Sequence, residues 1–119
     1  MPGNILVVDN AGLAQAALEQ AGYHVTTAAD GAELLAKVKA DKPDMVVCDA
    51  MMPQIDGFDV VQKLKAETPT RSIPTVMLGG PSDSEVHRGW TSGADCYLTK
   101  PFDQAELLDF VGKLLQMGR

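Results

Sequence analysis

The chain has 119 residues, which is enough for one domain with a single hydrophobic core. Ten Lys and Arg residues against 16 Asp and Glu give a formal charge of -6, which argues against direct binding of nucleic acid or of an anionic membrane. No apolar run approaches the roughly 18 residues of a spanning helix, and the N-terminus "MPGNILVVDN" lacks a signal pattern, so we expect a cytoplasmic protein.

Short apolar segments recur along the chain and predict five strands. Three of them are continuous apolar runs, which favours parallel strands covered on both faces, whereas the second is more polar and is typical of an edge strand. Pro74 lacks an N–H group, so it can only open its strand. The predicted strands are residues 4–8, 24–28, 44–48, 74–78 and 96–98.

Segments with helical periodicity lie between and after these strands. Asp30 with Glu33, and Asp103 with Glu106, have the spacing of a capping box at the start of a helix. Alternating strands and helices of this size predict a doubly wound α/β sandwich. The predicted inward stripes are Leu13, Ala17, Leu18 and Ala21; Leu34, Leu35 and Val38; Phe58, Val61 and Leu64; Val86 and Trp90; and Leu107, Phe110, Val111 and Leu114.

Polar and charged residues follow the predicted strands. Right-handed crossovers put the carboxyl end of every strand on one edge of the sheet, where ligands bind in open α/β folds. Two carboxylates and one ammonium are therefore expected to converge on a crevice, unless the carboxylates only cap helices and the lysine is only solvated. These strand ends carry Asp9-Asn10, Asp49, Gly79-Gly80 and Lys100-Pro101.

The order and spacing of these residues resemble the receiver domain of two-component response regulators over essentially the whole chain. The matching segments are "ILVVDN", "GYHVTTAADGAELL", "PDMVVCDAMMPQIDGFDVVQKLK", "IPTVML" and "GADCYLTKPF". The resemblance implies one receiver domain over residues 1–119. We expect no output domain in this chain, which is either a single-domain regulator or a fragment whose effector was cut away. It also implies a flavodoxin-like parallel sheet of five strands in the order 2-1-3-4-5, with five helices.

The resemblance also implies roles for the residues at this edge. Asp49 would take a phosphoryl group from a phosphohistidine, and Lys100 would pair with a phosphoryl oxygen, so the domain would catalyse its own phosphorylation rather than turn over as an enzyme. Asp9, Asp49 and the Met51 carbonyl would hold Mg²⁺, with Asn10 as a neutral ligand. The switch would consist of Gly79, Gly80 and Tyr97. The loops would be shaped by Pro53, by Gly57 with its unusual backbone angles, and by a cis Lys100–Pro101 bond.

Three features depart from the usual receiver pattern. Asn10 replaces a second acidic residue, which predicts weaker Mg²⁺ binding, and Gly79 replaces a Ser or Thr whose hydroxyl would contact the phosphoryl group. A backbone N–H of Gly79-Gly80 could substitute for that hydroxyl. The segment "NAGLAQAAL" is about four residues shorter than usual, close to one helical turn, and it lacks a capping residue after Asn10. We therefore expect a frayed start to this helix.

Two functions remain open from the sequence. The first is a phosphoacceptor that binds a sensor histidine kinase or phosphotransfer protein and then presents its fourth helix, fifth strand and fifth helix to a target, with possible dimerisation on phosphorylation. The second is a phosphorylation-independent adaptor. A kinase or phosphatase of another α/β family is disfavoured because no Gly-x-x-x-x-Gly-Lys loop is present. Cys48 and Cys96 are expected to be buried, and His24 and His87 to be surface residues.

Overall fold

A parallel five-stranded sheet forms the centre of the protein. The computed structural model describes residues 3–9, 12–51, 55–80 and 82–117. Within these residues the strand order is β2-β1-β3-β4-β5, and each neighbouring pair is parallel, so the predicted fold class and strand order are confirmed. The strands are β1 (Asn4–Val8), β2 (His24–Thr27), β3 (Met45–Asp49), β4 (Thr75–Gly79) and β5 (Cys96–Thr99).

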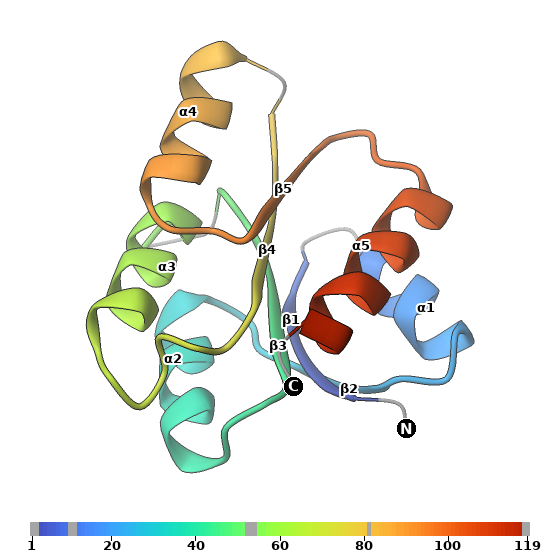
Figure 1. Cartoon of the computed structure of the whole chain (residues 1–119), viewed down its shortest axis with the longest axis horizontal. Helices are drawn as coiled ribbons and strands as arrows, with labels where there is room; N and C mark the ends of the chain where they lie inside the picture. The colour runs from blue at the N-terminus through green and yellow to red at the C-terminus, as the bar shows by residue number, and fades with distance from the viewer. Residues whose placement is uncertain (1–2, 10–11, 52–54, 81, 118–119) are drawn as a thin grey trace.

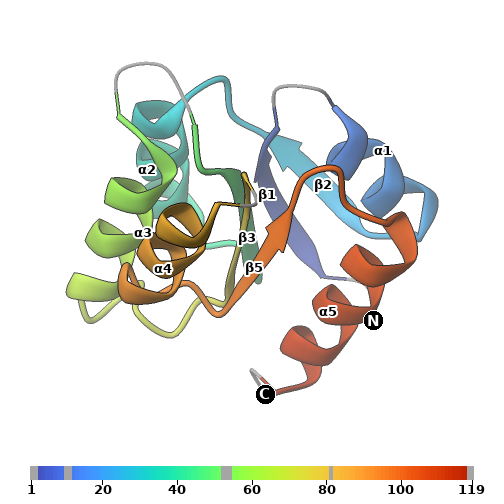
Figure 2. The same ribbon diagram turned by 90° about the horizontal axis from the view of Figure 1, so that it is seen from above.

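Helices cover both faces of the sheet, which is seen edge-on in Figure 1. Figure 2 shows the same arrangement from above. The first face is covered by α1 (Leu13–Gln20) and α5 (Gln104–Met117). The second face is covered by α2 (Gly31–Ala40), α3 (Gly57–Ala66) and α4 (Asp83–Thr91). In the part of the chain that is described, no helix is both long and apolar enough to cross a bilayer.

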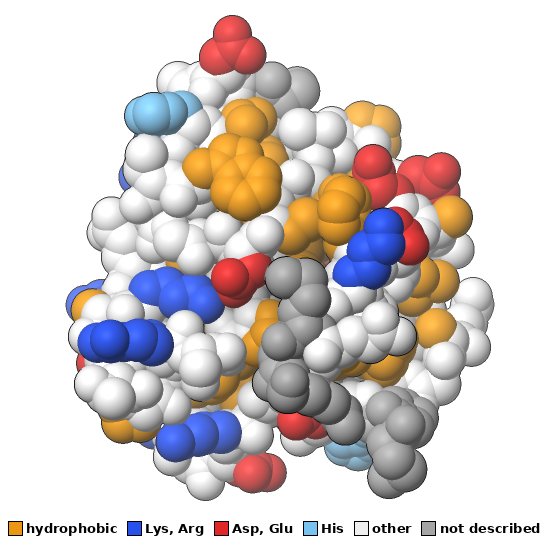
Figure 3. Space-filling view, viewed as in Figure 1, with side chains coloured by type: hydrophobic (Ala, Val, Ile, Leu, Met, Phe, Trp, Pro, Cys, Tyr) orange, Lys and Arg blue, Asp and Glu red, His pale blue; other side chains and the backbone are white. Residues whose placement is uncertain are grey.

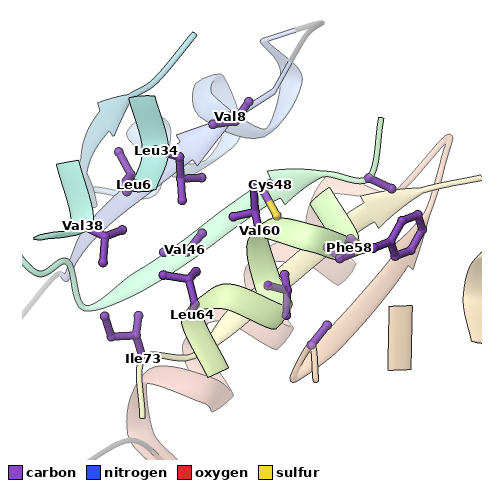
Figure 4. Close-up of a cluster of buried hydrophobic side chains, with 14 of the residues drawn as sticks. Leu6, Val8, Leu34, Val38, Val46, Cys48, Phe58, Val60, Leu64 and Ile73 are labelled. Atoms are coloured by element: carbon purple, nitrogen blue, oxygen red, sulfur yellow. The ribbon is translucent and has the colours of Figure 1, made fainter. Parts of the chain in front are cut away.

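The sheet divides the hydrophobic core into two clusters. Successive side chains of a strand point to opposite faces, so a continuous apolar run feeds both clusters at once. Figure 4 shows the cluster beneath α2 and α3, to which the central strands contribute Leu6, Val8, Val46 and Cys48. The cluster beneath α1 and α5 receives Ile5, Val7, Met45 and Val47 from the same two strands.

The strands β3 and β4 extend one residue further than the apolar runs predict. Asp49 and Gly79 are the last residues of these strands, because the backbone ladder continues through them. The N–H of Ala50 donates to the carbonyl of Leu78 at 2.7 Å, and the N–H of Lys100 donates to the carbonyl of Gly79 at 2.8 Å. The predicted edge position of β2 is confirmed. Because every neighbouring pair of strands is parallel, the carboxyl ends of the strands lie on one edge of the sheet, and β3, β4 and β5 run towards the top of Figure 1.

The capping residues predicted for α2 and α5 accept backbone hydrogen bonds. Asp30 Oδ1 accepts from the N–H of Glu33 at 2.8 Å, and Glu33 Oε1 accepts in return from the N–H of Ala29 at 2.6 Å. At α5, Asp103 Oδ1 accepts from the N–H of Ala105 at 2.9 Å. Both helices therefore begin where the sequence predicts.

Three members of the predicted inward stripes are wrong. Leu13, the first residue of α1, is 57% exposed. Trp90 is 53% exposed, because it is Gly89 that α4 buries against the sheet. Ala21 follows the last residue of α1 and is exposed. The expectations for the cysteines and histidines are confirmed: Cys48 and Cys96 are buried free cysteines, and both histidines are exposed.

Candidate functional site

Three charged side chains meet where β1, β3 and β5 end. The register pairs Val8 of β1 with Cys48 of β3, so Asp9 and Asp49 occupy the next level of two neighbouring strands. Lys100 directly follows β5. Parallel pairing thus gathers residues that are far apart in the chain at one edge, as the sequence predicts.

Asp49 and Lys100 form an ion pair across this edge. Lys100 Nζ contacts Asp49 Oδ1; the Asp49 side chain is fully buried, whereas that of Lys100 is 41% exposed. A buried carboxylate needs a cation or hydrogen-bond donors, and Lys100 supplies a cation. Lys100 is therefore more than a solvated charge. The bond between Lys100 and Pro101 is cis, as the family resemblance implies.

Asp9 supports the start of α1 as well as lining the edge. Its Oδ2 accepts from the N–H of Ala14 at 2.5 Å, and its carbonyl accepts from the N–H of Gly12 at 3.2 Å. Gly12 adopts the left-handed conformation, with φ of 76°. The N-cap residue Gly12 supplies no side-chain cap, as predicted, but Asp9 reaches past Gly12 and satisfies an N–H of the first turn. Asn10 lies outside the described residues.

The chain after Asp49 folds back tightly onto its backbone. The N–H of Gly57 donates to the carbonyl of Ala50 at 2.8 Å. A Cβ atom at Gly57 would lie 2.3 Å from the Asp49 carbonyl oxygen, and this close approach requires glycine. Unusual backbone angles are not the reason, because Gly57 is absent from the described glycines with positive φ, so that expectation is wrong. Asp56 caps α3 by accepting from the N–H of Asp59 at 2.9 Å.

The other described loop residues predicted for the site are exposed. Met51 follows Asp49 by two positions and is 67% exposed, and Pro101 is also exposed. Pro53 lies outside the described residues. A cavity of about 340 Å³ opens beside the ion pair and is lined by Asp9, Leu13, Lys100, Pro101 and Phe102.

The end of β4 holds the predicted switch residues in direct contact. A Cβ atom at Gly79 would lie 2.2 Å from the hydroxyl oxygen of Tyr97, which is only 8% exposed. The Tyr97 hydroxyl donates to the carbonyl of Gly80 at 2.8 Å. Glu85 was missed by the sequence reading, although Ser82-x-x-Glu85 has capping-box spacing. Its Oε2 accepts from the N–H of Gly80 at 3.2 Å.

The donor atoms available at this edge suit Mg²⁺. The carboxylates of Asp9 and Asp49 and the carbonyl of Met51 would be hard oxygen ligands, and Mg²⁺ binding sites in proteins commonly combine such ligands with water. Among the described residues no cluster of three or more His, Cys, Asp or Glu side chains could hold a metal.

Comparison with known proteins identifies the family. A model of the response regulator receiver domain matches residues 5–112. The chain belongs to this family. The receiver is 41% identical over 118 residues to the DNA-binding dual master transcriptional regulator RpaA of Synechocystis, covering 94% of this chain and 48% of RpaA. It is 43% identical over 121 residues to the response regulator PleD of Caulobacter vibrioides, covering 96% of this chain and 26% of PleD. The receiver thus spans half or less of these relatives.

Solved receiver structures have the same fold. The chemotaxis response regulator CheY4 of Vibrio cholerae superposes with a TM-score of 0.85 at 31% identity, covering 96% of the receiver and 99% of CheY4. The receiver domain of the sensor histidine kinase PA1611 of Pseudomonas aeruginosa gives 0.88 at 26% identity, covering 98% of the receiver and 99% of that domain. The latter structure is described with magnesium coordinated in its active-site cleft.

Proposed function

We propose that this receiver accepts a phosphoryl group on Asp49 from the phosphohistidine of a sensor kinase or phosphotransfer protein. The observation that carries the proposal is the fully buried Asp49 carboxylate at the end of β3, paired with Lys100 and level with Asp9. Phosphoryl transfer needs an in-line nucleophile and nearby cations rather than covalent help from other side chains. This edge of the sheet offers both.

In the proposed reaction, an oxygen of Asp49 forms a bond to phosphorus while the bond from phosphorus to the histidine nitrogen breaks. The other ring nitrogen of the phosphohistidine carries a proton, so the histidine leaves with the electron pair as neutral imidazole, and Asp49 becomes an acyl phosphate. Lys100 Nζ, already beside Asp49, moves to a phosphoryl oxygen and balances its charge. Gly57 lets the loop lie close against the Asp49 backbone and fixes the position of the nucleophile.

Asp9, Asp49 and the Met51 carbonyl would hold Mg²⁺. The ion would neutralise the charge on the phosphoryl oxygens when bound. Asp9 already directs one carboxylate oxygen to the N–H of Ala14, so metal binding has to use its other oxygen or weaken that cap. Together with the neutral Asn10, this supports weaker Mg²⁺ binding than in a receiver with two acidic residues after β1.

The first prediction concerns Asp49 itself. Incubation with acetyl phosphate and Mg²⁺ is expected to add one phosphoryl group, detected by intact-mass analysis, and the Asp49→Asn variant is expected to gain none because it lacks the nucleophile. A Mg²⁺ titration measures the metal requirement, and EDTA is expected to abolish the adduct.

The matched control for this experiment is Asp44→Asn. Asp44 precedes the first residue of the same strand, and its carboxylate accepts from the N–H of Asn4 at 2.8 Å. This variant is expected to be phosphorylated like the original chain. A folded original chain with no adduct at high Mg²⁺ would contradict the proposal and would leave a phosphorylation-independent adaptor.

Phosphorylation is proposed to change protein contacts on the face formed by α4, β5 and α5. Trp90 of α4 is 53% exposed, and Figure 3 shows hydrophobic side chains at the surface beside α4. Exposed aromatic side chains are frequent in protein interfaces. A target protein or a second copy of the receiver are the partners that we propose for this face. The DNA-binding activity named for RpaA belongs to a protein about twice as long.

A further inference from the structure

The backbone of Gly80 is held by two side chains from different elements. Its N–H donates to Glu85 Oε2 of α4 at 3.2 Å, and its carbonyl accepts from the Tyr97 hydroxyl of β5 at 2.8 Å. Ser82, which caps α4, donates from its hydroxyl to Glu85 Oε1 at 3.0 Å. Glu85 thus connects the end of β4 to the first turn of α4.

Gly80 also lies next to the proposed phosphorylation site. The register pairs Leu78 of β4 with Asp49, and the carbonyl of Gly79 accepts from the N–H of Lys100 at 2.8 Å. The end of β4 is therefore flanked by the strands that carry the nucleophile and its lysine. A Cβ atom at Gly80 would lie within 2.9 Å of three Glu85 carboxylate atoms, so glycine allows the carboxylate to approach this backbone.

Tyr97 already occupies an inward position in the unphosphorylated protein. Its ring fills a slot that Gly79 and Gly89 leave open, since a Cβ atom at Gly89 would lie 2.3 Å from Tyr97 Cδ2. Burial, and then the charge of Glu85, raise the pKa of the Tyr97 phenol. Because the ring is already seated, an inward movement of Tyr97 cannot report phosphorylation. A signal from Asp49 has to reach the surface by another route.

We propose that Glu85 carries this signal. At rest its carboxylate accepts from the Gly80 N–H; the phosphoryl group on Asp49 displaces the carboxylate from this N–H and so loosens the first turn of α4. This inference rests on the proposed phosphorylation of Asp49. A phosphoryl group is an anion that seeks backbone N–H donors, and it repels a carboxylate bound to the same donor. Released from Gly80, Glu85 no longer links β4 to the start of α4.

The test compares the original chain with Glu85→Gln, before and after treatment with acetyl phosphate and Mg²⁺. Glutamine keeps an oxygen that accepts from Gly80 but removes the charge. Intact mass reports the adduct, and hydrogen exchange reports the first turn of α4. In the original chain, phosphorylation is expected to raise exchange in this turn about tenfold, the factor that one charge-assisted hydrogen bond contributes. The adduct of the variant is expected to form several-fold faster.

Glu33→Gln is the matched control, because Glu33 makes the equivalent contact at the start of α2. It is expected to leave both readouts as in the original chain. An adduct in the original chain without increased exchange in α4, or with equal rates of formation in the Glu85→Gln protein, would overturn this inference and leave the proposed function intact. No adduct in either protein would overturn both.

Discussion

At the scale of single residues, Gly79 affects the site in two ways. It lacks a side-chain hydroxyl, and it leaves space for the Tyr97 side chain. A Ser or Thr there would supply a hydroxyl, but any side chain would collide with the Tyr97 hydroxyl 2.2 Å from the Cβ position. Gly79 and the buried Tyr97 are therefore a matched pair. The missing hydroxyl is evident from the sequence, whereas the structure adds the reason that glycine is compatible with this tyrosine.

Replacing Gly79 by Ser is expected to destabilise the protein by about 1–3 kcal/mol, because the added atoms overpack the slot. The measurement is urea unfolding. Combining Gly79→Ser with Tyr97→Ala tests the cause: in that background the serine is expected to cost at least about 1 kcal/mol less.

Gly112→Ala is the control for this series, because the nearest atom to a Cβ there is the Tyr23 hydroxyl at 3.9 Å. Because Gly112 lies in the middle of α5, the substitution is expected to leave the free energy of unfolding unchanged or to raise it by up to about 1 kcal/mol. An equal cost of Gly79→Ser with and without Tyr97 would show that the two residues do not compete for space.

At the scale of secondary-structure elements, Asp95 and Lys65 fasten three of them together. Lys65 Nζ at the end of α3 contacts Asp95 Oδ2 at 2.9 Å and donates to the carbonyl of Ile73 at the same distance. Asp95 Oδ2 also accepts from the N–H of Thr75 at 2.8 Å. The end of α3 is thereby tied to the segments that begin β4 and β5, opposite the phosphorylation site.

Asp95→Asn is expected to cost about 1–3 kcal/mol in the free energy of unfolding, because it removes the charge that Lys65 and Thr75 share. Chemical unfolding measures this. The pair formed by Lys113 and Asp109 on α5 offers the comparison, since both side chains are more than half exposed. Asp109→Asn is expected to cost less than about 0.5 kcal/mol. Equal costs for the two substitutions would show that the Asp95 network does not stabilise the fold.

These elements also show which contacts local sequence can predict. The capping box of Asp30 and Glu33 spans four residues and was predicted, because its chemistry is local. Lys65 and Asp95 are 30 residues apart, and no local pattern pairs them. Glu85 lies between these cases: its spacing to Ser82 was visible, but its bond to Gly80 depends on how β4 meets α4. Likewise, the contact between Asp49 and Lys100 followed from strand topology, whereas the support of α1 by Asp9 did not.

At the scale of the whole molecule, the sheet is a partition between two independent packing layers. Every described residue of β3 and β4 is buried, so substitutions there act on the core as well as on the site. Cys48 shows the connection: it belongs to the layer beneath α2 and α3 and directly precedes Asp49. Burial, and then the Asp49 charge, raise the pKa of its thiol to about 12.

This raised pKa predicts a loss of stability in alkali. Below pH 9.0, the ordinary value, the Cys48 thiol is protonated in both the folded and the unfolded chain and makes no difference. Between that value and about 12, the unfolded thiol ionises and the folded one does not, so the free energy of unfolding falls as pH rises. The slope is about 1.4 kcal/mol per pH unit.

Urea unfolding between pH 8 and about pH 11 measures this slope, and Cys48→Ala is expected to reduce it. The comparison uses the slope and not the absolute stability, because removing the sulfur also leaves a cavity. Identical slopes for the two proteins would contradict the assignment of the alkaline loss to Cys48.

The two cysteines lie in different layers, Cys48 beneath α2 and α3 and Cys96 beneath α1 and α5. Only a thiolate is alkylated quickly, and burial raises the thiol pKa values to about 12 and about 11, so each sulfur reacts when its own layer opens. The alkylation rates of Cys48 and Cys96 therefore report the opening of the two layers separately. Unequal alkylation rates would mean that the two layers open separately. Equal rates would mean that the helices leave both faces of the sheet in one event.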